Sequence, residues 1–170
     1  MSLSMHAVAV PIFLNTLGAL SKILDKAAAH CTTKKIDPAA LLTMRLYPDM
    51  FTLTKQVQLT CDFAKNTIGR LTGEPPKFPD DEKTFDELKA RIAKTVDYVK
   101  GFSAADIDGT AGKDVTFPIG PQQTMTLNGA DYLVGFALPN FYFHATTAYN
   151  ILRELGVDIG KMDFMGRPPQ

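Results

Sequence analysis

The sequence has no excess of charge of either sign. Its 170 residues include 18 Lys and Arg and 18 Asp and Glu, so the formal net charge is zero. Nucleic-acid-binding modules normally carry a basic excess that neutralises phosphates. The balance therefore argues against a nucleic-acid partner. A DNA-binding helix-turn-helix protein is disfavoured for the same reason, because no basic recognition helix is present.

Cysteine is scarce. Cys31 and Cys61 are the two cysteines of the chain, and they lie far apart. They form no CxxC or zinc-knuckle spacing, so neither a redox pair nor a zinc-binding motif is indicated. We interpret them as two buried, reduced thiols of a cytoplasmic protein.

Uninterrupted hydrophobic runs are also missing, since no apolar run reaches membrane-spanning length without a polar residue. The apolar stretch 7–20 has no Lys or Arg before it, and Pro11 and Asn15 interrupt it. Its leucines instead keep helical spacing. We therefore expect a structural helix here and neither a signal peptide nor a membrane span.

Common catalytic motifs are absent as well, because the sequence contains no GxSxG, HExxH or GxGxxG. The acidic cluster 80–82 precedes a predicted helix, where negative charge is stabilised by the helix dipole. No motif of this kind therefore assigns a reaction to the chain.

What the sequence does contain is helical periodicity. Apolar residues spaced three and four apart predict long helices over 4–30, 48–71, 85–99 and 138–155. Asp37 and Pro38 predict the start of a short helix that extends to Met44. Thr84 and Glu87 form a capping box at the start of the third long helix.

Between residues 101 and 128 the period changes to two. The stretches 115–117 and 124–127 alternate around Gly120-Pro121, which predicts a small β-hairpin. Residues 129–136 are expected to be helical, and 158–170 to form an irregular tail. The predicted fold is one all-α domain over 1–170, a four-helix bundle of up-down-up-down order with the hairpin between the third and fourth long helices.

The last predicted helix is apolar nearly all round, with one polar line formed by Asn140, His144 and Thr147. If consecutive helices alternate in direction, one end of the bundle gathers several polar and aromatic side chains: His30, Cys31, Tyr47, Asp49, Tyr98, Asn140 and His144. Such a group can bind a metal or carry out acid–base chemistry.

A resemblance to a known family is carried by the helical-bundle plan and by three segments, 46–51 (LYPDMF), 139–144 (PNFYFH) and 160–166 (GKMDFMG). Over essentially its whole length, the chain resembles the DUF1993 family. That family lies within the DinB/YfiT-like superfamily of proposed metalloenzymes. The resemblance implies a bundle whose divalent metal is held by one histidine near the start of the second long helix and by a His-x-x-x-His pair on the last.

Carried over by position, the resemblance implies a metal site with zinc, nickel or manganese. His144 matches the second histidine of the pair, Asn140 stands at the first, and Asp49 lies near the start of the second long helix. The other residues expected to line a pocket are His30, Tyr47, Tyr98 and Phe141.

Structural alternatives remain open for each candidate. His144 can be a buried histidine hydrogen-bonded to Asn140 and to a neighbouring helix. Asp49 and His30 can stabilise helix ends, and Asp62 can form an ion pair with Arg91.

Two functions are therefore considered. The first is an uncharacterised DinB-like protein, a degenerate metalloenzyme with a pocket around His144. The alternative is a non-catalytic bundle that binds a small apolar molecule or a second copy of itself, as a homodimer.

Overall fold

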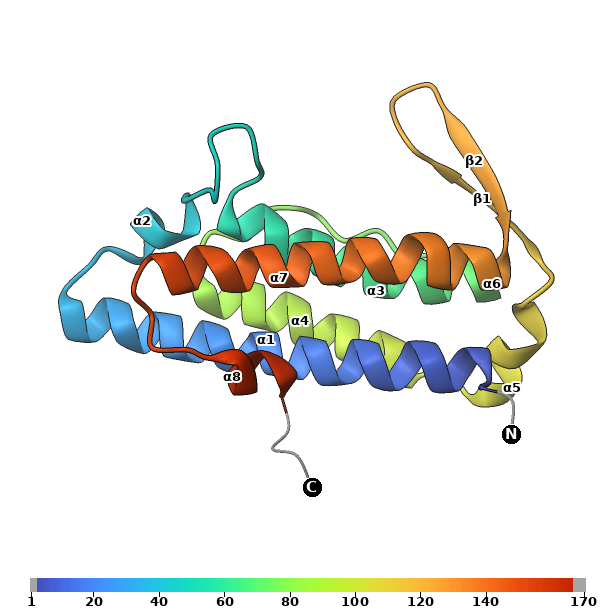
Figure 1. Cartoon of the computed structure of the whole chain (residues 1–170), viewed down its shortest axis with the longest axis horizontal. Helices are drawn as coiled ribbons and strands as arrows, with labels where there is room; N and C mark the ends of the chain where they lie inside the picture. Colours follow the sequence, from blue (N-terminus) through green and yellow to red (C-terminus); the bar gives the residue numbers. More distant parts are fainter. Residues whose placement is uncertain (1–2, 167–170) are drawn as a thin grey trace.

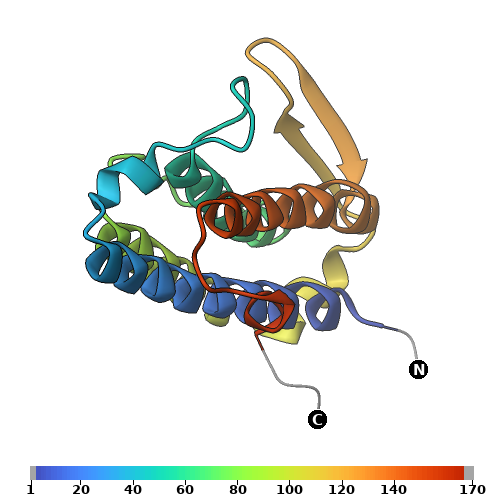
Figure 2. The ribbon, with the colours of Figure 1, turned by 60° about the vertical axis from the view of Figure 1, so that its left-hand side comes forward.

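The computed structural model describes residues 3–166. Four long helices lie side by side: α1 (Met5–Lys34), α3 (Leu53–Thr72), α4 (Phe85–Lys100) and α7 (Leu138–Glu154) (Figures 1 and 2). Short helices connect or extend them: α2 (Pro38–Leu42), α5 (Ala104–Ile107), η1 (Asp108–Thr110), α6 (Gly129–Asp131), η2 (Tyr132–Ala137) and α8 (Lys161–Met165). The predicted class, a mostly helical chain with one small hairpin, is confirmed.

The helices α3 and α4 run in the same direction. Gln58 donates to Glu82 over 2.8 Å, and Asp62 accepts from Arg91 over 2.7 Å, so contacts advance along both segments together. By contrast, α1 is antiparallel to α4, since Lys89 pairs with Asp25 near the end of α1. The predicted up-down-up-down order is therefore wrong.

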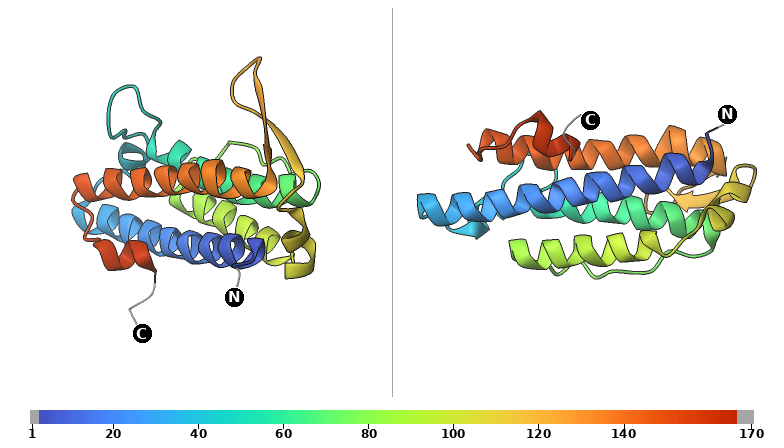
Figure 3. Two further views of the ribbon diagram at one scale, coloured as in Figure 1. Left: turned by 45° about the vertical axis from the view of Figure 1, so that its right-hand side comes forward. Right: turned by 90° about the horizontal axis from the view of Figure 1, so that it is seen from below.

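The reason is the segment 73–84, which returns along the bundle instead of turning tightly (Figures 1 and 3). Gly73 ends α3, and Pro75, Pro76 and Pro79 exclude a helix. A fully extended segment of this length spans at most roughly 40 Å. The helix α4 is about 24 Å long at ~1.5 Å per residue. The segment is thus long enough to bring the chain back to the other end, where α4 begins.

Helix boundaries explain where the candidate residues lie. Ser4 caps α1, which continues to Lys34, four residues beyond the predicted end at His30. Thr52 caps α3, which begins at Leu53 and not at Pro48 as predicted. The residues before Thr52 form a loop, because Met50 N–H bonds back to Tyr47 and Arg45 bridges to Thr52.

The capping box of α4 is present, with Thr84 and Glu87 bonding each other's backbone. The predicted hairpin is also present, as β1 (Asp114–Pro118) and β2 (Thr124–Asn128) in antiparallel register. Residues 129–136 are helical as expected, and the helical stretch continues through Ala137, with η2 a π-helical stretch that leads into Pro139. The predicted irregular tail contains α8, and its residues 167–170 lie outside the described part.

The core lies between the four long helices and is almost wholly apolar. Phe13, Leu24, Leu53, Ile68 and Phe141 are fully buried members of it. α1 is apolar and long enough to cross a membrane by length and composition, but half of its apolar stretch is buried against the rest of the bundle. The core helix of a globular protein has the same composition, and α1 fits that description.

Candidate functional site

His144 is the buried polar centre of α7, with a relative exposure of 7%. Its Nδ1 lies 2.8 Å from Oε1 of Gln56 on the facing helix α3, and Gln56 is 1% exposed. The amide nitrogen of Gln56 donates to the carbonyl oxygen of Phe51, 3.4 Å away, so the oxygen of the amide faces His144. Nδ1 must therefore carry the proton, and Nε2 carries the free lone pair.

The imidazole of His144 is neutral at pH 7. Burial, together with the nearby Lys55 ammonium, lowers the pKa of His144 to about 4. Among the described residues, the one fully buried side-chain nitrogen or oxygen without a partner is Nε of Arg91. For Nε2 of His144 no hydrogen-bond partner is found in the described part of the chain, so this nitrogen is available to accept a hydrogen bond from a ligand.

Aromatic rings surround this imidazole. Phe63 of α3 stacks on His144 at 5.5 Å with an interplanar angle of 21°. Phe143 meets the ring edge-on at 5.3 Å and is 55% exposed. Phe136 continues the row beyond Phe63 at 6.1 Å, and Phe117 of the hairpin follows at 4.5 Å. The neutral acceptor thus lies beside a partly exposed aromatic surface.

The polar line on α7 is divided among separate partners. Asn140 donates to the carbonyl oxygen of Phe136 over 2.8 Å, and Thr147 to that of Phe143 over 2.7 Å. Both bonds are made one turn back along the same helix. His144 alone reaches another long helix, so the expected bond to a neighbouring helix is found and the one to Asn140 is not.

The structure does not bring the predicted pocket residues together. Tyr47 is 66% exposed and shares the loop before α3 with Asp49, which is also exposed. Phe141 is fully buried against Phe13, with ring centroids 4.8 Å apart.

The remaining two pocket candidates are separated along the bundle. Tyr98 packs against Phe102, past the end of α4. The antiparallel pair Asp25–Lys89 sets the register of α1 against α4. That register offsets His30 and Tyr98 by about 20 Å at ~1.5 Å per residue. The prediction that His30 and Tyr98 lie close together required α4 to run parallel to α1, whereas the two helices are antiparallel.

As metal donors, the described residues do not fit a three-ligand catalytic site. His144 supplies one imidazole nitrogen, and Asn140 supplies an amide oxygen, which is a poor ligand for zinc or nickel. Within residues 3–166 no group of three or more His, Cys, Asp and Glu side chains could hold a metal ion. The assignment of His144, Asp49 and Asn140 as ligands stays a prediction.

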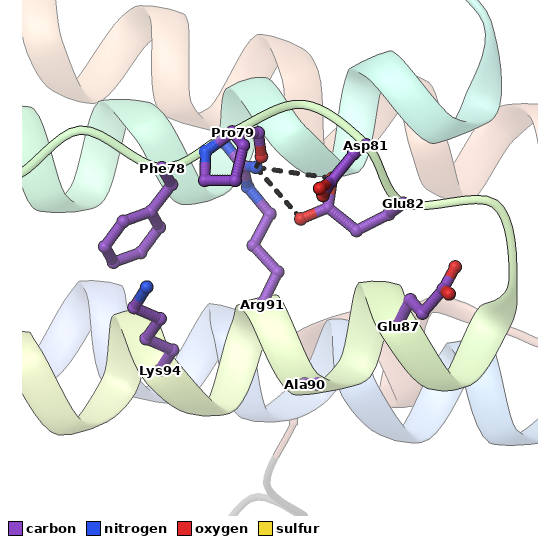
Figure 4. A pocket seen from close by; sticks show the side chains of 8 residues that line it. All are labelled: Phe78, Pro79, Asp81, Glu82, Glu87, Ala90, Arg91 and Lys94. Atoms are coloured by element: carbon purple, nitrogen blue, oxygen red, sulfur yellow. Dashed lines mark hydrogen bonds and ion pairs between the residues drawn. The ribbon is translucent and has the colours of Figure 1, made fainter.

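A second polar cluster surrounds Arg91 of α4, whose predicted ion pair with Asp62 is confirmed at 2.7 Å. Figure 4 shows the guanidinium beneath the 73–84 segment, beside Glu82 at 3.0 Å and the carbonyl oxygen of Pro79 at 2.7 Å. Asp80 also pairs with it at 3.0 Å. The acidic cluster was expected to stabilise a helix end, but Asp80 and Glu82 instead hold this segment to the bundle.

A cavity of about 280 Å³ lies beside this cluster. Its lining includes Phe78, Asp81, Glu82, Arg91 and Lys94 (Figure 4). Sequence reasoning missed it, although the density of charge around 80–94 was visible. Two of the charged groups that line the cavity, Arg91 and Glu82, are already paired with each other. The ammonium of Lys94 lies 4.1 Å from the centroid of the Phe78 ring. The cluster therefore acts as an anchor for the returning segment.

The two cysteines are free and buried, as predicted. Cys61 is fully enclosed between α3 and α4, and burial raises the pKa of its thiol to about 12. A thiol of this kind is not a nucleophile at neutral pH.

The fold and this site define a DinB-like helical protein in which a single histidine occupies the polar centre. The family described as DUF1993, a domain of unknown function, matches residues 5–165, and the chain belongs to that family. It is similar to a crystal structure of a DinB family member protein from Shewanella denitrificans, with 42% identity and a TM-score of 0.89. That likeness covers 97% of this chain and 93% of the other. No curated protein matches the chain.

Proposed function

We propose that this chain is a DinB-like protein with a degenerate metal site, in which His144 binds a small molecule directly through Nε2. The observation that carries the proposal is the buried bond between His144 and Gln56, 2.8 Å long. This bond keeps the proton on Nδ1, which faces Gln56, and leaves Nε2 as a neutral hydrogen-bond acceptor for the ligand.

The chemistry of the surroundings defines the ligand class. A neutral imidazole with a free lone pair accepts a hydrogen bond from a hydroxyl or N–H group. Phe63 and Phe143 offer ring faces and edges to an apolar or aromatic body. The expected ligand is therefore a small, mostly apolar molecule with one hydrogen-bond donor, and the proposal assigns binding without assigning a reaction.

The proposal also assigns the architecture and location. The four long helices act as one DinB-like four-helix bundle, with order up-down-down-up, and the protein works in the cytoplasm. Free, buried Cys31 and Cys61 are in keeping with a reducing compartment.

Metal content is the first test. Protein purified without added metal or chelator is analysed by inductively coupled plasma mass spectrometry, beside His144→Ala and Asp49→Ala. We expect no stoichiometric zinc, nickel or manganese in any of the three. Stoichiometric metal in the wild type that is lost from His144→Ala would overturn the proposal, since His144 would then be a ligand.

Phenol and anisole test the binding mode, because they share a ring and differ in the hydroxyl donor. The affinity of each compound is measured by isothermal titration calorimetry for the wild type and for His144→Phe, and in the wild type the chemical shifts of the His144 ring are also followed by NMR. We expect phenol to bind more tightly than anisole, and His144→Phe, which keeps an aromatic ring, to abolish the difference. Equal binding of both compounds by the wild type, or no shift with either, would contradict the proposal.

A further inference from the structure

The hairpin β1–β2 projects from the side of the bundle (Figures 1 and 2). In the described residues its sheet has two strands only. One face is anchored, since Val115 and Phe117 of β1 are buried, whereas β2 is exposed along most of its length. Two-stranded sheets are marginal by themselves and gain stability from further strands.

The hydrogen-bond pattern shows which backbone groups of β2 point outward. Ile119 N–H donates to the carbonyl oxygen of Gln123 over 3.0 Å. In antiparallel strands, bonded pairs alternate with non-bonded pairs. The register then makes Phe117–Met125 a bonded pair, and it turns the N–H and C=O groups of Thr124 and Thr126 to the free edge of β2.

The two edges of the hairpin differ in their protection. On β1, Pro118 occupies an outward position and removes a donor, and Asp114 adds a charge. On β2, the stretch 122–128 has no charged residue and no proline. Natural sheet edges are normally blocked by such residues, because unpaired edges recruit other strands. The β2 edge lacks this protection.

We propose that the β2 edge pairs with β2 of a second copy of this chain, giving a four-stranded antiparallel sheet across a two-fold axis. Asn128 is engaged as the cap of α6, so the pairing uses Thr124 opposite Thr126 of the second copy. Met125 then meets Met125 of the second copy at the axis. This pairing covers an apolar side chain that is 37% exposed in one chain.

A second copy fits this edge better than another partner does. The two-fold axis places the same uncharged residues opposite each other, so the edge is complementary to itself. Like-charge repulsion between copies is also minimal, because the net charge of the chain is zero. A partner selected by charge would find no charged residue on 122–128 to recognise.

Cross-linking tests the register. Opposite residues of a non-bonded antiparallel pair have Cα atoms about 4.5 Å apart, which a disulfide can bridge. We expect Met125→Cys to form a cross-linked dimer under mild oxidation, and Thr116→Cys on the other edge to stay uncross-linked. Cys31 and Cys61 are 2% and 0% exposed and should not react. Absence of cross-linking at Met125→Cys, or equal cross-linking of both variants, would overturn the register.

Thr126→Pro tests the edge without an added thiol, since it removes an outward N–H and leaves the β1–β2 backbone bonds in place. It also removes the side-chain bond of 2.8 Å between Thr126 and Thr116, so Thr126→Val, which loses only that bond, is the control and should still dimerise. Sedimentation velocity over a concentration series should show a monomer–dimer equilibrium for the wild type and a monomer for Thr126→Pro. Circular dichroism should show equal helix content in both. A wild-type monomer at every soluble concentration, or a dimer that survives Thr126→Pro, would refute pairing through β2.

Discussion

Nη2 of Arg91 on α4 donates to Oδ1 of Asp62 on α3 over 2.7 Å, and this bond joins two helices that run in the same direction. Parallel neighbours need a connection that crosses the full length of the bundle. Nη1 of the same guanidinium holds that connection, through Pro79 and Glu82. One buried side chain therefore links two helices and the segment between them.

Arg91→Met should destabilise the protein strongly. Arg91 is 4% exposed, and its removal leaves Asp62, Asp80 and Glu82 close together without their shared cation. Removing one partner of a buried ion network costs about 3 kcal/mol or more. Urea unfolding followed by circular dichroism measures the loss. Lys100→Met, an exposed position in the last turn of α4, is the control, and an equal effect of both variants would contradict the anchoring role.

Gly69 should tolerate no side chain. A Cβ added there would lie 2.4 Å from Cα of Pro75, so the returning segment would have to move. We expect Gly69→Ala to lower the free energy of unfolding by about 2 kcal/mol, in the range of overpacked sites. Gly18→Ala is the matched control, because no atom lies within 4 Å of its added Cβ. As a helix-interior change it should stabilise by about 0.5–1 kcal/mol.

The long helices could be predicted from the sequence because apolar spacing and caps are local. Thr84 and Glu87 fixed the start of α4 correctly, since both partners lie within one turn. The start of α3 was misplaced because Pro48 is a good first helical residue, yet the chain turns there and the cap is Thr52. Both Pro48 and Thr52 are suitable residues for a helix start. The contacts of the loop before Thr52, such as the bridge between Arg45 and Thr52, place the start at Leu53.

The direction of α4 could not be read locally. It depends on the path of 73–84, which is set by contacts with Arg91 and Lys55 on distant turns of helix. This one error displaced Tyr98 from the predicted pocket. His144 was identified as the polar centre, but its partner Gln56 was missed, because a glutamine on an amphipathic helix gives no sign of facing inward.

Stability should fall in a defined pH range because of His144. Its pKa is about 4 in the folded protein, against an ordinary value of 6.5. The unfolded chain therefore binds the proton more tightly, and the stabilisation present above pH 6.5 is lost as the pH falls toward 4. We expect a loss of about 2 kcal/mol, less than the full difference in pKa would give, because His144 is still 7% exposed and solvent screens part of the effect.

Urea unfolding at several pH values tests this, and His144→Phe should remove the decrease in that range. The same decrease in both proteins would show that other groups cause it.

Gln56→Glu should raise the pKa of His144. The substitution keeps the shape of the side chain and places a carboxylate where the amide oxygen lies 2.8 Å from Nδ1. An opposite charge at this distance favours the imidazolium, and it typically moves a pKa by about 1 to 3 pH units. The pKa of His144 should rise from about 4 toward the ordinary 6.5. NMR titration of the ring protons measures it, with the three histidine signals assigned by single substitutions. Gln56→Leu removes the acceptor without adding charge, so there the pKa should stay low. A pKa unchanged in Gln56→Glu would show that the glutamine does not set the protonation of His144, and the tautomer assignment would fail with it.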